Sequence, residues 1–154
     1  MSWLKPMETS RLHLSMFCIS DVPIVQQLAG DYDVAKTTLN ILQPYEDGMA
    51  EDWVIRQFDA IVLGQTVSYA VTLRSDGTLI EAISLVIDKV SRWAELGYWI
   101  GKPYWNNGYC TKAAQALVHY GFIELGLNRI QARHMACNPA SGQVMRKRGH
   151  AVRG

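Results

Sequence analysis

A short segment of the sequence has the features of an anion-binding turn. Residues 103–113 read PYWNNGYCTKA, in which a polar stretch containing Gly108 runs directly into an alanine-rich helical pattern. The first amides of a helix have no partner inside the helix, and the helix dipole adds partial positive charge there. A turn of this kind that follows a strand is suited to binding phosphate. The segment therefore predicts a ligand that carries phosphate groups.

The glycine pattern of this turn differs from two common phosphate-binding motifs. The dinucleotide fingerprint needs three spaced glycines, and the P-loop ends in Gly-Lys followed by Ser or Thr; residues 103–113 have neither pattern. Lys112 falls in the first helical turn, where a cation opposes the helix dipole unless an anion is bound nearby. We therefore expect a phosphate-bearing ligand of another kind.

The histidines and cysteines indicate neither a metal site nor a disulfide framework. His13, His119 and His134 have no partner at catalytic or metal-ligand spacing. The cysteine count is odd and the cysteines show no paired spacing, which favours a reducing compartment. They are Cys18, Cys110 and Cys137. We interpret the last two as packing residues and expect no metal.

The size and charge of the chain limit the classes of function. The 154 residues, about half of them hydrophobic, predict a single domain over 1–154. A net charge of +1 gives no reason to expect nucleic acid as a partner. The sequence has no signal sequence and no apolar run of about 18 residues, so we expect no membrane association and a cytoplasmic location.

Apolar spacing predicts the elements that position the turn. Alternation of apolar and polar residues predicts strands, and Asp76-Gly77 predicts a hairpin between two of them. The expected strands are 12–16, 66–73, 79–87, 93–100 and 128–135. Helical spacing is found at 21–28, 49–62 and 111–125. Asn138 and Pro139 are typical of the start of a last helix.

Several linked motifs resemble the GNAT acyltransferase superfamily, and the branch that acetylates the N-terminal amines of ribosomal proteins in particular. The family loop Arg/Gln-x-x-Gly-x-Gly/Ala is matched by residues 105–110, with Trp105 in the first position and Cys110 in place of the small residue. The segments ETSRLHL, PYEDGMAEDW, ELGYWIGKPYW and NPASGQVMRKRGH extend the resemblance over nearly the whole chain. It implies a mixed α/β fold of the α+β type, with a twisted, largely antiparallel sheet flanked by helices.

The resemblance also implies acetyl-CoA as the co-substrate. In such proteins the loop amides hold the pyrophosphate of coenzyme A, and the pantetheine arm lies beside the strand that corresponds to 95–100. The amides of residues 98–100 are the candidates for polarising the thioester carbonyl. The implied cofactor-binding residues are Tyr98, Trp99, Ile100, Asn106, Asn107, Gly108, Tyr109, Cys110, Thr111 and Asn138.

The resemblance assigns Glu95 and Ser141 to catalysis. Glu95 is the candidate base that removes the ammonium proton, directly or through water, and alternation puts it on the face of Gly97 and Trp99. Many relatives use a tyrosine as the general acid on a helix near the end of the chain, but no tyrosine follows Tyr120. Ser141 is then the candidate acid, with water as the alternative.

Other candidates remain open. Asn138 is both a helix cap and a candidate cofactor neighbour. Arg146, Lys147 and Arg148 either complement the dipole of the last helix, which we favour, or reach the adenosine 3′-phosphate. Trp53, Trp93 and Trp99 are expected in the core or in the walls of an acceptor pocket.

The chain departs from the family pattern after RKRGHAVRG, where the family continues with two strands. We therefore expect the C-terminal strand pair to be missing and the domain to be truncated. The strand at 128–135 would become an open edge, available for homodimer formation. A truncated sequence, a partner chain and a degenerate protein all remain as explanations.

The expected activity is direct acetyl transfer from acetyl-CoA to a primary amine, with a protein or peptide N-terminus as the acceptor. One alternative is acetylation of a small-molecule amine. A second is a non-catalytic module that binds acyl-CoA or another protein. A nucleotide-binding regulator has no motif to support it.

Overall fold

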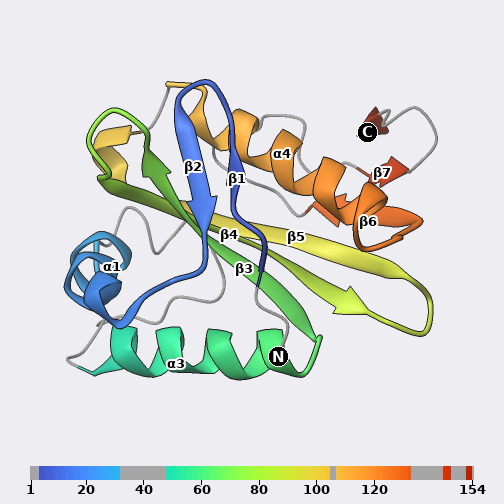
Figure 1. Ribbon diagram of the computed structural model, residues 1–154, viewed down its shortest axis with the longest axis horizontal. Helices are drawn as coiled ribbons and strands as arrows, with labels where there is room; N and C mark the ends of the chain where they lie inside the picture. The colour runs from blue at the N-terminus through green and yellow to red at the C-terminus, as the bar shows by residue number, and fades with distance from the viewer. Residues whose placement is uncertain (1–3, 32–47, 105–106, 133–143, 147–151, 154) are drawn as a thin grey trace.

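The computed structural model describes residues 4–31, 48–104, 107–132, 144–146 and 152–153, the last two segments by their backbone alone. Within these residues the chain forms one eight-stranded sheet whose strand order follows the sequence (Figure 1). The strands are β1 (Met7–Glu8), β2 (Leu12–Ser15), β3 (Thr66–Leu73), β4 (Leu79–Asp88), β5 (Trp93–Ile100), β6 (Arg129–Ala132), β7 (Val144–Arg146) and β8 (Val152–Arg153).

The described helices are few and short. The α-helices are α1 (Val22–Ala29), α3 (Met49–Val62) and α4 (Tyr109–Ile123), and the 3-10 helices are η1 (Ile19–Asp21) and η2 (Lys102–Tyr104). The longest of them, α4, has 15 residues. No helix in the described part of the chain is long and apolar enough to cross a membrane.

The sheet contains one parallel pair of strands. Strands β5 and β6 are parallel, and all other neighbours are antiparallel. Parallel neighbours require a crossover connection, which α4 supplies. Because α4 returns from the end of β5 to the start of β6, its N-terminus lies at the C-terminal end of β5. This topology positions the predicted anion-binding turn.

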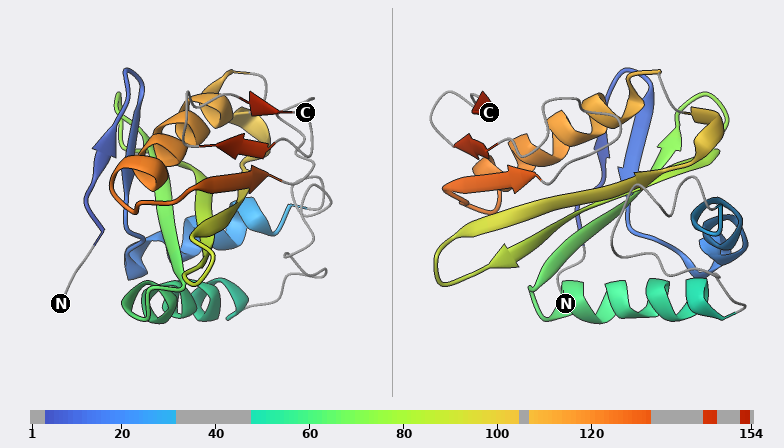
Figure 2. Two further views of the ribbon diagram at one scale, coloured as in Figure 1. Left: turned by 90° about the vertical axis from the view of Figure 1, so that its right-hand side faces the viewer. Right: turned by 180° about the vertical axis from the view of Figure 1, so that it is seen from behind.

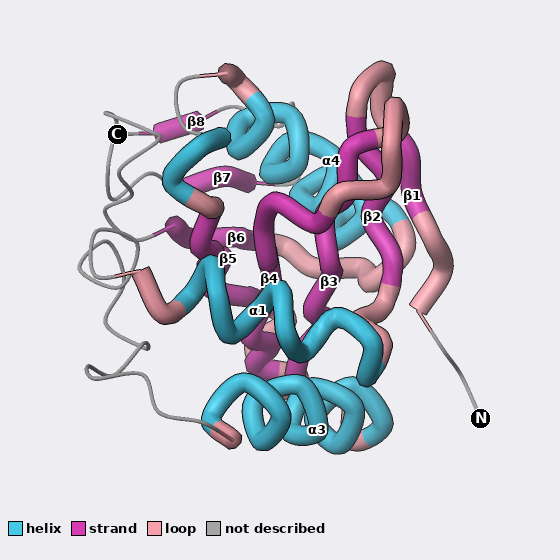
Figure 3. The backbone as a smooth tube through the Cα atoms, turned by 90° about the vertical axis from the view of Figure 1, so that its left-hand side faces the viewer, coloured by secondary structure: helices cyan, strands magenta, loops and turns pink. Residues whose placement is uncertain are grey.

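Helices cover both faces of the sheet. Figures 1 and 2 show α1 and α3 on one face and α4 on the other, and Figure 3 shows α1 and α3 side by side. Each face has its own apolar cluster because strand residues alternate between them. On β4, for example, Ile83 and Leu85 belong to the cluster under α4, while Ala82 belongs to the cluster under α1 and α3.

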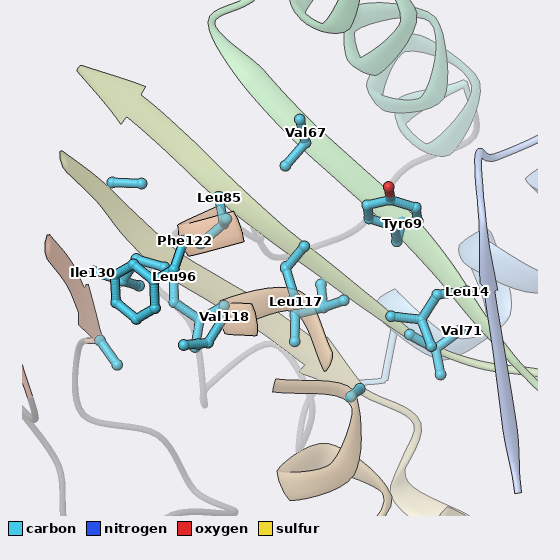
Figure 4. Packing of buried hydrophobic residues seen from close by; sticks show 14 of the residues in the cluster. Leu14, Val67, Tyr69, Val71, Leu85, Leu96, Leu117, Val118, Phe122 and Ile130 are labelled. Atoms are coloured by element: carbon cyan, nitrogen blue, oxygen red, sulfur yellow. The ribbon is translucent and has the colours of Figure 1, made fainter. Parts of the chain in front are cut away.

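The packing of α4 on the sheet depends on a glycine. Figure 4 shows Val118 and Phe122 of α4 gathered with Leu96 and Ile130 of the sheet. One residue before Phe122, Gly121 is buried, and a Cβ atom there would lie 2.9 Å from Cδ1 of Ile130. It would also lie 3.1 Å from Cδ1 of Leu85. Gly121 therefore allows the helix to approach β4 and β6 closely.

Most of the elements expected from the sequence are confirmed. The expected ranges of β3, β5 and α3 agree with the structure, and β4 extends one residue further, to Asp88. The Asp76-Gly77 hairpin is present, with Gly77 at φ 76° and the Thr78 amide donating to Oδ1 of Asp76 at 3.0 Å. Helix α4 begins at Tyr109, two residues earlier than expected. Strand β1 was not expected, because two residues are too few to show a period.

The expected open edge at residues 128–135 is wrong. Strand β6 pairs with β7, where Arg129 lies beside Arg146, and β7 pairs with β8. The backbone groups on this side of β6 are therefore paired within the chain. The open edge on which the expectation of a homodimer rested is absent from β6. Arg146 lies in a strand and not in the expected last helix. The other residues expected in that helix, 138–143 and 147–148, lie outside the described residues.

We predict that replacing Gly121 with valine destabilises the protein by about 1–3 kcal/mol, because the added atoms overpack a closed contact. Gln115→Val is the matched control, since it puts the same side chain on the exposed face of α4. That change should cost about 0.5 kcal/mol, the helix-propensity difference alone. Urea denaturation of both variants measures this, and equal losses would contradict the close approach.

Candidate functional site

The turn before α4 has the geometry of an open helix N-terminus. Gly108 is the N-cap residue in the left-handed conformation, at φ 76° and ψ 2°, and as a glycine it has no side chain with which to cap the helix. A residue with a side chain is strained at such a positive φ, whereas glycine is not. The Lys112 amide donates to the Gly108 carbonyl at 3.1 Å and forms the first helical hydrogen bond. The amides of residues 109–111 come before this bond and have no helical acceptor.

The electrostatics of this turn favour an anion. The first turn of α4 contains no acidic residue, and Lys112 adds a positive charge. Arg11 brings a second cation from the other end of the sequence, because its Nη2 donates to the Asn107 carbonyl at 2.8 Å. Together with the helix dipole, these charges make the turn an electropositive end of α4.

The structure brings together five of the predicted cofactor-binding residues. Asn107, Gly108 and Thr111 are exposed at the turn, Tyr109 is half-buried, and Cys110 is buried at 3% exposure. Cys110 is disulfide-bonded, so the expectation that it only fills space is wrong, as is the argument against a disulfide from the odd cysteine count. Asn106, Asn138 and Ser141 lie outside the described residues.

Strand β5 leads toward the turn and contains the remaining predicted residues. Its register with β6 runs from Trp93 beside Arg129 to Leu96 beside Ala132, and β5 then continues to Ile100. Tyr98 packs against the cluster under α4, while Trp99 belongs to the cluster under α1 and α3. Consecutive residues of this strand end thus serve opposite faces of the sheet.

Glu95 is half-buried on the same face as Trp99, as the alternation predicted. Its neighbours in register are Val86 on β4 and Gln131 on β6. Trp99 lies in a group of aromatic rings, with ring centroids 6.4 Å apart between Trp99 and Trp53. The ring of Phe17 makes an edge-to-face contact with Trp53 at 5.0 Å. Aromatic side chains therefore line the sheet face that carries Glu95, where α1 and α3 cover it.

Two residues near this site were not singled out by the sequence analysis. Arg11 belongs to the segment ETSRLHL, and only the fold brings it to Asn107, 96 residues away. Glu81 is a single acidic residue inside the apolar strand segment LIEAISL, and its burial depends on the packing of both neighbouring strands. A lone glutamate in a strand gives no sequence signal of burial.

Glu81 is an uncompensated buried acid beside the site. Its side chain is 0% exposed, and it lies between Val71 of β3 and Ile100 of β5 in register. Neither carboxyl oxygen has a hydrogen-bond partner among the described residues. Burial raises the pKa of the Glu81 carboxyl well above its usual range, because a low dielectric disfavours the charged form. Glu81 therefore stays protonated where an exposed glutamate ionises.

The described residues include no group of three His, Cys, Asp or Glu side chains that could hold a metal ion. His13 lies on β2, with its Nδ1 3.5 Å from Oε2 of Glu8. His134 lies outside the described residues. Tyr69 is fully buried, its hydroxyl donates to the Lys5 carbonyl at 3.0 Å, and burial raises its pKa far above the usual range. Tyr69 is therefore a structural residue.

The fold and the turn together define a class of protein. A largely antiparallel sheet flanked by helices, with a helix N-terminus that follows a strand, is the arrangement implied by the sequence resemblance. The structure adds the parallel β5–β6 pair that this helix connects. The family model of the acetyltransferase (GNAT) domain matches residues 11–150. The chain therefore belongs to the GNAT acetyltransferase family.

Individual relatives agree with this assignment. The chain is 29% identical over 131 residues to an N-acetyltransferase called p20 from Bacillus licheniformis, over 84% of this chain and 73% of that protein. It is 31% identical over 68 residues to a ribosomal-protein-serine acetyltransferase of Escherichia coli, over 44% of this chain and 38% of that protein.

A solved structure has the same fold. It is RimL, a ribosomal L7/L12 alpha-N-protein acetyltransferase in complex with coenzyme A, which superposes with a TM-score of 0.75 at 17% identity. The match covers 83% of this chain and 73% of RimL. At this identity the likeness concerns the fold.

We predict that Glu81 makes stability fall as pH rises. In the unfolded chain this carboxyl ionises near its usual pKa, about 4.3, whereas in the folded protein it keeps its proton to higher pH. The unfolded state then binds fewer protons, so the free energy of unfolding decreases between pH ~4.5 and the raised pKa, by up to about 1.4 kcal/mol per pH unit.

Replacing Glu81 with glutamine should remove this pH dependence. Urea denaturation from pH 4.5 to 7.5 should show the Glu81→Gln variant gaining stability over the parent as pH rises. Glu124→Gln makes the same change at an exposed position at the end of α4 and should run parallel to the parent. Parallel curves for all three proteins would show that Glu81 is charged or solvated.

Proposed function

We propose that this protein transfers the acetyl group of acetyl-CoA directly to a primary amine, and that its acceptor is the N-terminus of a protein or peptide. The observation that carries the proposal is the N-terminus of α4 at the end of β5, which has a glycine as its N-cap residue and no acidic residue in its first turn. RimL, which shares the fold, is a protein N-terminal acetyltransferase with bound coenzyme A. Because RimL acetylates a protein N-terminus, it supports the choice of a protein or peptide N-terminus as the acceptor of this chain.

The turn fits a pyrophosphate group. Gly108 has no side chain above its amide, and the nearest heavy atom to a Cβ built there is Nη2 of Arg11 at 3.5 Å. The turn offers peptide amides, the dipole of α4 and two nearby cations, Arg11 and Lys112. Together these groups favour a doubly charged anion. In this proposal the amides of residues 107–111 hold the pyrophosphate of coenzyme A.

The pantetheine arm would lie along the end of β5. Among the described residues, the pairing of β5 with β6 runs as far as Leu96, and residues 97–100 continue β5 toward the turn. An extended strand end presents regularly spaced amide and carbonyl groups, which match the peptide-like units of pantetheine. The amides of residues 98–100 are then the candidates for stabilising negative charge on the thioester oxygen.

Glu95 is proposed as the general base. An amine acceptor is protonated near neutral pH, and it becomes a nucleophile only after losing a proton to a positioned group. Glu95 lies on the strand of the proposed pantetheine path and on the face lined by Trp99 and Trp53. The acceptor would therefore approach from the α1–α3 side, and the phosphates would bind at the α4 side.

The proposed transfer step forms an amide bond and releases coenzyme A. The amine nitrogen attacks the thioester carbon, the C–N bond forms, the C–S bond breaks, and coenzyme A leaves as a thiolate. Glu95 takes the first proton of the ammonium group before the attack. The thiolate takes a proton from a general acid, which is restored by the second proton that the nitrogen loses as the amide forms. Ser141 is the proposed acid and Asn138 a proposed neighbour of pantetheine, with water as the alternative acid; both residues lie outside the described part of the chain.

We predict that the purified protein acetylates peptides with a free N-terminus in the presence of acetyl-CoA. Release of the coenzyme A thiol is the measurement, and mass spectrometry locates the acetyl group. Peptides with a blocked N-terminus but a free lysine, and polyamines, are the comparison acceptors. Faster turnover of polyamines would contradict the proposed acceptor, and binding of acetyl-CoA without turnover of any amine would favour a non-catalytic module.

Replacing Glu95 with glutamine should lower kcat/KM by about 100-fold or more, the usual size of a general-base effect. The matched control is Glu51→Gln, which makes the same change at an exposed position in the first turn of α3. The control should keep the parental rate. Equal rates for the two variants would remove Glu95 from the mechanism while leaving acetyl transfer itself intact.

A further inference from the structure

Arg11 contacts both residues that flank the N-cap glycine of α4. Its Nη2 donates to the carbonyl oxygen of Asn107 at 2.8 Å. Its guanidinium carbon lies 4.6 Å from the ring centroid of Tyr109. Gly108 stands between these two residues, with its open Cβ position 3.5 Å from Arg11 Nη2. One planar cation thus spans the turn, through a hydrogen bond on one side and a ring contact on the other.

The hydrogen bond to Asn107 has a consequence for the amide that follows. A trans peptide unit is planar, and its C=O and N–H groups point in opposite directions. When Arg11 binds the Asn107 carbonyl, it fixes the plane of the Asn107–Gly108 peptide. The Gly108 amide is then directed away from Arg11, and the carbonyl oxygen, which would repel a phosphate, is held by a cation.

The backbone of Arg11 is anchored to the sheet. The next residue, Leu12, is 0% exposed and pairs with Leu73 of β3. The carbonyl of Arg11 accepts a hydrogen bond from the Arg74 amide at 2.9 Å. The sheet therefore fixes the backbone of Arg11, and the side chain reaches the turn from this fixed point. Figure 1 shows the β1–β2 connection beside the start of α4.

The contact of Arg11 is selective within a shared pocket. A cavity of about 460 Å³ is lined by Ser10, Arg11, Leu73, Arg74, Ser75 and Tyr109. Arg74 lines the same cavity, but its Nη1 donates to the Thr9 carbonyl at 2.9 Å, and its Nε lies 3.6 Å from Oε2 of Glu8. The two arginines thus share a location and a charge, but Arg11 contacts Asn107 and Tyr109 of the turn, whereas Arg74 contacts Thr9 and Glu8.

We propose that Arg11 is a positioning residue for the phosphate-binding turn, which holds the Asn107–Gly108 peptide in the orientation that presents the Gly108 amide to a phosphate. The proposal rests on the proposed function for the identity of the ligand. The orientation of the peptide itself does not depend on that identity, so it can be tested in the ligand-free protein.

The test compares Arg11→Gln, Arg11→Lys and Arg74→Gln. Backbone ¹⁵N relaxation at residues 108–110, measured by NMR without ligand, reports the order of the turn. Arg11→Gln should lower the order parameters of these amides from about 0.85, the value of a rigid backbone, toward about 0.6, since a hydrogen bond that fixes the peptide is lost. Arg74→Gln removes the same charge from the same cavity and should leave these order parameters at the parental values.

The second readout is the kinetics with acetyl-CoA. Arg11→Gln should raise KM for acetyl-CoA about tenfold and change kcat less than twofold, because Arg11 orders the binding turn and does not touch the reacting atoms. Arg11→Lys keeps the charge but lacks the planar fork, so it should lie closer to Arg11→Gln than to the parent.

Two results would overturn the positioning role. One is equal order parameters and equal KM in Arg11→Gln and Arg74→Gln, and the other is full recovery of both quantities in Arg11→Lys, which would reduce Arg11 to a point charge. If the parent binds no coenzyme A, the proposed function fails. The relaxation data on the ligand-free protein still decide the role of Arg11.

Discussion

The packing of α4 against the sheet is the constraint on which the site depends. A parallel β5–β6 pair requires a crossover, and the crossover helix is packed on the sheet by apolar side chains such as Leu117 and Phe122, both 0% exposed. Gly121 brings the helix close to β4 and β6. Once this contact forms, the N-terminus of α4 must lie beyond Ile100. The position of the proposed anion site is therefore a consequence of core packing, with local charge added to it.

In the proposed reaction, the phosphates and the amine lie on opposite faces of the sheet. Tyr98 and Trp99 are consecutive on β5, yet each joins a different apolar cluster. Phosphate binding is proposed at the α4 end, and the amine is proposed to approach on the α1–α3 face, so the strand end between them is where the two substrates would meet. Glu81 lies beside Ile100 in register and is the one described acid that is fully buried. Its neutral form keeps negative charge out of the core near the phosphate site.

Local patterns in the sequence predicted most of the longer elements of the fold. Strict alternation defined β3 and β5, and the Asp76-Gly77 pair defined the hairpin, because these features involve neighbouring residues. The turn at Gly108 was predicted for the same reason. The pairing of β7 with β6 was not predicted, since three residues carry too little pattern, and the result reversed the expectation of an open edge. Arg11 and Glu81 were missed because their roles arise from contacts between distant segments.

The central claim is that the amides at the start of α4 bind the pyrophosphate of coenzyme A. The most direct measurement is a titration of the ¹⁵N-labelled protein with coenzyme A, followed by amide NMR shifts. The account predicts that the largest shifts fall at Gly108, Tyr109, Cys110 and Thr111, with smaller ones along residues 97–100. Saturable binding whose shifts fall elsewhere, or the absence of any shift in the folded protein, would contradict it.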